Sequence, residues 1–355
     1  MGASGSSSAV TVGEHSALPV DAVPYKGTRL QYDIIGIKAI GITRMGRNLR
    51  IDLTPYFELF NDPYQRGFRV VVLKWVPGLQ QKLHVQYGME RRYYIFFQAI
   101  LVKPEDSPSA PIGQVKFAQV SICIKDDLHP VGENVTYASE TANLTDFNTL
   151  IESEAHSGYE LVSFQGISYS KDKLSKDSKN TNLLMQLVFH KSFELQSSPC
   201  VYQSLVIPVT YTTVERMRVS RRRIYGLASD VFPQLQNMLQ QGWKIVDVTY
   251  LSSKLQGAFN PSEDNITFNT MWVFSKRAAG SASEQPTWEC SIVKYSHHIK
   301  VSGGGRRSTT TWLPIMEEMG GRGWELAAIL DTAESRQSGF GALQTLLLVF
   351  QRPSL

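Results

Sequence analysis

The 355-residue chain has few cysteines, no long apolar run and no familiar catalytic motif. Its three cysteines, Cys123, Cys200 and Cys290, are odd in number and far apart, which excludes a disulfide framework and a Cys-x-x-Cys zinc site. No stretch approaches the roughly 18 apolar residues of a membrane-spanning helix, and the N-terminus has no apolar signal core. We therefore expect a cytoplasmic protein with free thiols.

Signatures of enzymes are also missing. The glycines at 303–305 are not followed by the Gly-Lys-Ser/Thr of a phosphate-binding loop, and neither a Gly-x-Ser-x-Gly nor a His-Glu-x-x-His sequence occurs. His297 and His298 are neighbours in an expected strand, so their side chains point to opposite faces and cannot easily share a metal ion. We expect no catalytic residues, no bound metal and no cofactor.

What the chain does contain is one short pattern, a glycine followed by an aromatic residue and an apolar run, four times at nearly even spacing. A period near 80 residues is typical of an array of one small module. The four pairs are Gly67-Phe68, Gly158-Tyr159, Gly242-Trp243 and Gly323-Trp324.

Each pair is preceded by a helix-like stretch and followed by two apolar strands, the second ending in a basic residue. Glycine suits the left-handed residue just past a helix end, and the ring after it is best interpreted as covering that helix end rather than as a stacking platform. We predict an α+β fold of four β-α-β-β repeats, each one helix on a three-stranded antiparallel sheet, packed in pairs. The predicted segments are a disordered N-terminal tail at 1–26 and repeats at 27–104, 112–193, 201–278 and 286–353.

Arginines cluster in the connection between the first strand and the helix of the first, third and fourth repeats, whereas the second repeat has Asp126-Asp127 there. If the modules are alike, these connections lie at a common end and form a binding surface for anionic lipid or a partner. Each arginine near an anionic leaflet contributes about 1 kcal/mol. The clustered residues are Arg44, Arg47, Arg50, Arg216, Arg218, Arg221, Arg222, Arg223, Arg306 and Arg307.

The Gly-aromatic step with a strand ending in Phe-x-Lys/Arg resembles the raftlins, peripheral plasma-membrane proteins of lipid rafts. The resemblance depends on the order and spacing of several blocks from about residue 48 onwards. These blocks include 97–103, 207–209, 242–243, 272–274, 324–326 and 348–353. The repeat unit also resembles a small bacterial family of unknown function with a Gly-Trp-Glu-Leu signature.

The resemblance implies attachment through an acylated N-terminus. Gly2, with Ser6 in the required place, fits the myristoylation pattern, whereas Ala3 occupies the position of the family's palmitoylated cysteine. One myristoyl chain gives only marginal membrane binding, so the arginine clusters would supply a second attraction.

The function that the resemblance implies is that of a non-enzymatic peripheral adaptor at the inner face of the plasma membrane, with roles in raft organisation, receptor signalling and endocytic uptake. Its expected partners are anionic membrane lipids and unidentified proteins. One alternative is a soluble scaffold component of a larger assembly. Another is a nucleic-acid-binding protein that uses the arginines, although a net charge of only +4 argues against it.

Overall fold

The structure is a computed structural model of the chain. It describes residues 10–14, 25–44, 47–87, 90–130, 136–171, 179–193, 199–215, 222–227, 231–251, 265–278, 286–302, 305–308, 312–338 and 341–354.

The described chain is an α+β protein in which one order of elements, strand-strand-helix-strand-strand, occurs four times. The first repeat contains β2 (Leu30–Arg44), β3 (Arg47–Ile51), the 3-10 helix η1 (Thr54–Phe60), α1 (Asn61–Gln65), β4 (Arg69–Tyr87) and β5 (Glu90–Pro104). The second contains β6 (Gly113–Pro130), β7 (Thr136–Asn143), α2 (Thr145–His156), β8 (Glu160–Lys171) and β9 (Lys179–Ser192). The third contains β10 (Cys200–Glu215), β11 (Arg222–Leu227), α3 (Phe232–Gln240), β12 (Lys244–Tyr250) and β13 (Asn265–Arg277). The fourth contains β14 (Trp288–Ser302), β15 (Gly305–Ser308), α4 (Leu313–Gly320), β16 (Glu325–Ser338) and β17 (Gly341–Pro353).

The prediction of three strands in each sheet was wrong, because the structure has a fourth. Each described sheet has four antiparallel strands of its own repeat, in the order β3-β2-β5-β4 for the first and the equivalent order for the others. The additional strand, β3, β7, β11 or β15, pairs with the first strand of its repeat and forms an edge of the sheet. These strands are short and polar or basic, as protected edge strands are, so they lack the apolar alternation that predicts a strand.

Part of the predicted disordered tail is also ordered. Residues Val10–Glu14 form β1, which pairs in parallel with the start of β14, Val10 lying opposite Cys290. The β-branched sequence Val10-Thr11-Val12 favours an extended backbone, and β14 offers it a free edge.

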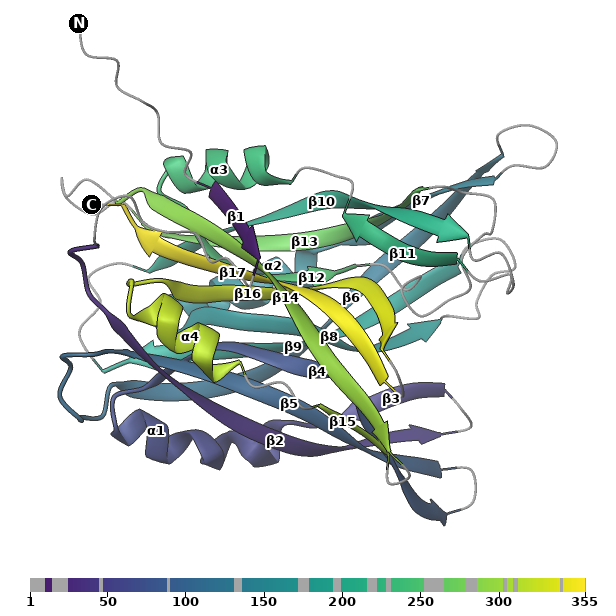
Figure 1. Cartoon of the computed structure of the whole chain (residues 1–355), viewed down its shortest axis with the longest axis horizontal. Coiled ribbons are helices and arrows are strands. Elements are labelled where there is room, and N and C mark those ends of the chain that lie inside the picture. The colour runs from purple at the N-terminus through teal and green to yellow at the C-terminus, as the bar shows by residue number, and fades with distance from the viewer. Residues whose placement is uncertain are drawn as a thin grey trace, which may run out of the picture.

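The four repeats form a closed ring rather than separate pairs. The edge strands β4, β8, β12 and β16 contact one another in succession around the centre, and β16 contacts β4 to complete the circuit. Each helix also packs on the first strand of the next repeat: η1 on β6, α2 on β10, α3 on β14 and α4 on β2. In Figure 1, α3, α4 and α1 lie outside the bundle of strands.

The hydrophobic cores explain why a ring is more stable than isolated modules. Each core cluster combines side chains of two successive repeats, including the last and the first. For example, Ile315 and Met316 of α4 pack in one cluster with Tyr32 and Val72 of the first repeat. A repeat of about 75 residues buries little alone, and sharing each core between neighbours removes more apolar surface from water.

The ring has two distinct ends. The first strand of each repeat ends, and the last strand begins, at one end of the ring, called the hairpin end here, on the right of Figure 1. At this end Arg44 pairs with both Arg47 of β3 and Glu90 of β5. The first strand of each repeat begins, and the last strand ends, at the opposite end, called the linker end.

Candidate functional site

The four signature glycines share one backbone conformation. Their φ angles are +86° at Gly67, +81° at Gly158, +81° at Gly242 and +74° at Gly323. Each follows the end of a helix, so the predicted left-handed helix stop is confirmed. The rings that follow are buried for Phe68 and Trp324 and half-buried for Tyr159 and Trp243.

Each aromatic ring of the signature is covered by a basic residue, the last but one of the final strand of its repeat. The cation lies 4.9 Å from the ring centroid for Lys103 and Phe68, 5.2 Å for Lys191 and Tyr159, 6.0 Å for Lys276 and Trp243, and 4.1 Å for Arg352 and Trp324. In the last three repeats the same cation donates a hydrogen bond to the carbonyl just before the glycine, at 3.0, 2.8 and 3.1 Å. The signature is therefore a helix C-terminal cap with a cation over the ring.

The strand that follows each helix, β4, β8, β12 or β16, lies at the edge of its sheet but at the centre of the ring, and these four are called the central strands. Each central strand carries a β-bulge four residues after the glycine. The register of pairing shifts around Val71, Val162, Val246 and Ala327. The backbone N–H just before each bulge donates to a side chain instead. The bonds are Val70 to Tyr64 at 3.3 Å, Leu161 to Tyr202 at 2.8 Å, Ile245 to Gln351 at 2.8 Å and Leu326 to Tyr32 at 2.7 Å. Except for Tyr64, these acceptors belong to a neighbouring repeat. The hydrogen bonds at three of the bulges therefore join successive repeats of the ring.

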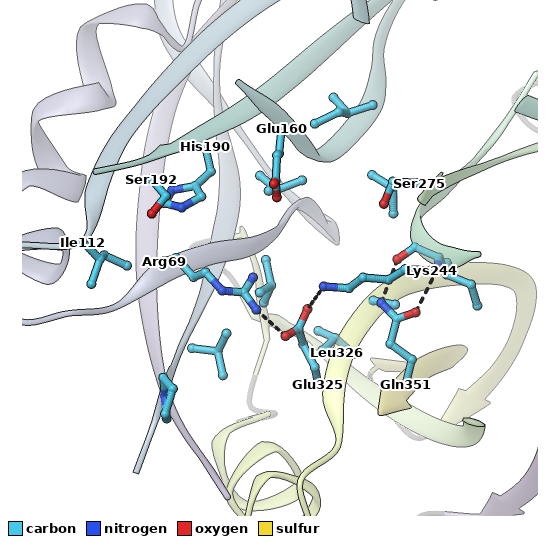
Figure 2. A pocket seen from close by; sticks show the side chains of 18 of the residues that line it. Arg69, Ile112, Glu160, His190, Ser192, Lys244, Ser275, Glu325, Leu326 and Gln351 are labelled. Atoms are coloured by element: carbon cyan, nitrogen blue, oxygen red, sulfur yellow. Dashed lines mark hydrogen bonds and ion pairs between the residues drawn. The ribbon is translucent and has the colours of Figure 1, made fainter. Parts of the chain in front are cut away.

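A cavity of about 660 Å³ lies where the four central strands meet at the linker end. Equivalent positions of all four repeats line it (Figure 2). The lining residues two positions after each glycine are Arg69, Glu160, Lys244 and Glu325. Those at the bulges are Val71, Val162, Val246 and Ala327. The last strand of each repeat contributes Val102, His190, Ser275 and Gln351.

Charges of opposite sign meet in this cavity. Glu325 accepts hydrogen bonds from Arg69 of the first repeat and from Lys244 of the third, the latter at 2.8 Å, and Figure 2 shows it between them. Oε1 of Glu160 lies 3.1 Å from a terminal guanidinium nitrogen of Arg277. Burial alone would raise the pKa of the Glu325 carboxyl, but the Arg69 and Lys244 charges outweigh it and hold that pKa at about 2. Glu325 is therefore ionised at neutral pH.

His190 is the buried titratable side chain of the cavity wall. It is 6% exposed, and its Nδ1 has no hydrogen-bond partner within the described part of the chain. Burial, reinforced by the charges of Arg69 and Lys244, lowers the pKa of His190 to about 3. The imidazole is therefore neutral at physiological pH.

A second charged pair, formed by Lys74 of β4 and Asp247 of β12, lies further along the central strands. Lys74 lies 2.8 Å from Asp247, which is fully buried. The carboxylate also accepts hydrogen bonds from Ser163 Oγ at 2.7 Å and from the backbone N–H of Phe164 at 3.0 Å and of Val248 at 2.7 Å. Three repeats meet at this saturated carboxylate, which indicates a structural role.

The described arginines of the predicted clusters lie in strands, toward the hairpin end. Arg44 ends β2, Arg47 and Arg50 lie in β3, Arg222 and Arg223 in β11, and Arg306 and Arg307 in β15, all assigned from the backbone. No strand was predicted between the first strand and the helix, whereas the structure has a short strand there that pairs with the first strand of its repeat. Gly2, Arg216, Arg218 and Arg221 lie outside the described residues.

Sequence reasoning missed the cavity, although a signal was present. The residue after each signature aromatic is charged in every repeat, and its sign alternates along the chain through Arg69, Glu160, Lys244 and Glu325. In a closed ring of four, such alternation gives each charge neighbours of opposite sign. The closure of the four repeats into a ring was not predicted from the sequence, and so these four charges were not placed together.

Comparison with known proteins gives no relative: the chain matches no family model, no curated protein and no solved structure. Within the described ranges, no group of three or more His, Cys, Asp and Glu residues is placed to hold a metal ion. None of the helices in these ranges has the length and hydropathy that a membrane-spanning helix requires.

Proposed function

We propose that the protein is a non-enzymatic peripheral binding protein that docks its hairpin end on anionic membrane surfaces, as a raftlin-like adaptor of the inner leaflet of the plasma membrane. In this role it would contribute to raft organisation, receptor signalling and endocytic uptake. The observation that carries the proposal is the position, at one end of the ring, of the arginine-bearing strands of three repeats.

A high density of arginines at one end of the ring favours binding to an anionic surface. In the register of the backbone ladders, Arg44 lies opposite Arg47 in the first repeat. Arg222 lies opposite Glu215 in the third, and Arg306 lies opposite Val301 in the fourth. Arginine binds phosphate oxygens through a planar fork of donors, and each residue near an anionic leaflet contributes about 1 kcal/mol. Arginines gathered at one end can act on the same membrane, whereas scattered ones cannot.

An acyl chain on Gly2 would not act at the same place while β1 is paired. Val10 lies opposite Cys290, and β14 extends from there to Ser302 at the hairpin end, about 40 Å at about 3.3 Å per residue. The eight Cα–Cα steps from Gly2 to Val10 span at most about 29 Å. In this proposal the arginines supply the docking, and acylation adds to it only after β1 leaves β14.

Sedimentation of the full-length, unacylated protein with vesicles tests the proposal. Wild type should bind vesicles containing phosphatidylserine and not neutral phosphatidylcholine vesicles. Replacing Arg222 and Arg223 together by Gln should weaken binding about 30-fold, because two contributions of about 1 kcal/mol are lost. The matched control replaces Lys26 and Arg29 by Gln, since both are exposed and lie at the linker end beside the start of β2.

Equal losses in the two double variants would contradict docking through the hairpin end. Equal binding to neutral and anionic vesicles, or none to either, would reject the electrostatic mechanism. Adding a single-stranded RNA oligonucleotide provides a further arm: tighter binding to RNA than to vesicles would favour nucleic-acid recognition instead.

A further inference from the structure

The axial cavity has the size and the layering of a ligand site. Its volume of about 660 Å³ falls within the roughly 300–1,000 Å³ of sites that take small organic molecules. Residues two and four positions after each glycine both face it. A charged layer containing Arg69 and Lys244 therefore lies nearer the linker end, and an apolar layer containing Val71, Val246 and Ala327 lies deeper.

The charged layer is not neutral. Three cations line the cavity, Arg69, Lys244 and Arg277, but only two carboxylates do, Glu160 and Glu325. The cations that line the cavity thus outnumber the carboxylates by one, which favours an anion over a cation as ligand.

The two cations that hold Glu325 retain capacity for a ligand. The side chains of Arg69 and Lys244 are 30% and 29% exposed, and each donates one described hydrogen bond to the carboxylate. A guanidinium carries five donors and an ammonium three.

We infer that the cavity binds one small organic monoanion with an apolar body, a carboxylate or sulfonate. Its anionic group would lie against Arg69 and Lys244, and its body against the valines and Ala327 of the bulges. The ligand would add a negative charge beside these two cations and cover the apolar layer. Because the cavity opens at the linker end, this inference does not depend on membrane docking.

Two probes of similar shape and different charge test the inference on the full-length protein. The monoanion is 8-anilinonaphthalene-1-sulfonate, and the neutral probe is N-phenyl-1-naphthylamine. Fluorescence titration should give one sulfonate site per chain, with at least tenfold weaker binding of the neutral probe. Decanoate should displace the sulfonate, and decanol should not.

Variants locate the site. Lys244→Met removes one of the two cations that would hold the anion and should weaken sulfonate binding at least tenfold while changing the neutral probe less than twofold. Lys294→Met removes an exposed lysine that does not line the cavity and should change neither. Ala327→Phe fills the apolar layer and should weaken both probes.

Several outcomes would overturn the inference: multiple sulfonate sites, equal affinities for the two probes, or displacement by decanol as effective as by decanoate. Equal effects of Lys244→Met and Lys294→Met would do the same. If Lys244→Met fails to fold, the decanoate and decanol comparison on wild type, together with Ala327→Phe, decides the question.

Discussion

Mild acid should destabilise the protein through His190. The pKa of this imidazole is lowered from 6.5 to about 3 in the folded chain, first by burial and then by Arg69 and Lys244. Between these values the unfolded chain binds a proton that the folded chain does not, so stability is fully present above pH 6.5 and falls as the pH decreases. At about 1.4 kcal/mol per pH unit, His190 alone removes about 2 kcal/mol between pH 6.5 and pH 5.

The assay is guanidinium unfolding at pH 7.5 and pH 5.0, followed by tryptophan fluorescence. His190→Gln is the comparison, since it keeps a neutral polar side chain that does not titrate. Wild type should lose about 2 kcal/mol more than the variant over this interval. Glu325 titrates identically in both proteins, so its contribution cancels in the difference. An equal loss in wild type and variant would refute the burial argument for His190.

Three further predictions concern the ring, the helix stop and the acyl chain. Tyr32→Phe should lower the free energy of unfolding by about 1–3 kcal/mol, because the Leu326 N–H and the Trp324 carbonyl lose their shared partner; denaturant unfolding measures this. Gly158→Ala should cost about 1–2 kcal/mol because φ is +81°, whereas Gly36→Ala, with no atom within 4 Å of the new Cβ, should cost nothing in the same assay. Acylation should strengthen vesicle binding in a Val12→Pro variant, which weakens β1, and not in wild type; a gain in wild type would contradict the separation of the two signals.

The part of the fold that sequence predicted is the part encoded locally. Gly158 stops α2, the apolar spacing of Phe147 and Ile151 marks its buried face, and both features recur at the repeat period. Short-range patterns of this kind depend on backbone conformation and periodicity, which a sequence displays directly.

The missing strands and the ring depend on long-range contacts. β7 has the sequence Thr-Tyr-Ala-Ser-Glu-Thr-Ala-Asn, whose polar residues suit a solvent-facing edge and do not differ from those of a loop. Ring closure requires Tyr32 to meet Trp324, 292 positions away, a contact that no local pattern encodes.

The cavity was not predicted for the same reason. Arg69 and Glu325 are 256 positions apart, and each alone reads as an ordinary charged residue at the start of a strand. Only the closed ring brings them together with Lys244, which binds the same carboxylate.

Hydrogen–deuterium exchange of the full-length protein, free and bound to phosphatidylserine vesicles, tests the docking proposal most directly. The account predicts slower exchange on binding at the hairpin end, in peptides covering 40–51, 222–227 and 300–308, and unchanged exchange at the linker end in 104–113. Protection confined to 104–113, or no protection of the arginine-bearing strands in the vesicle-bound protein, would contradict it.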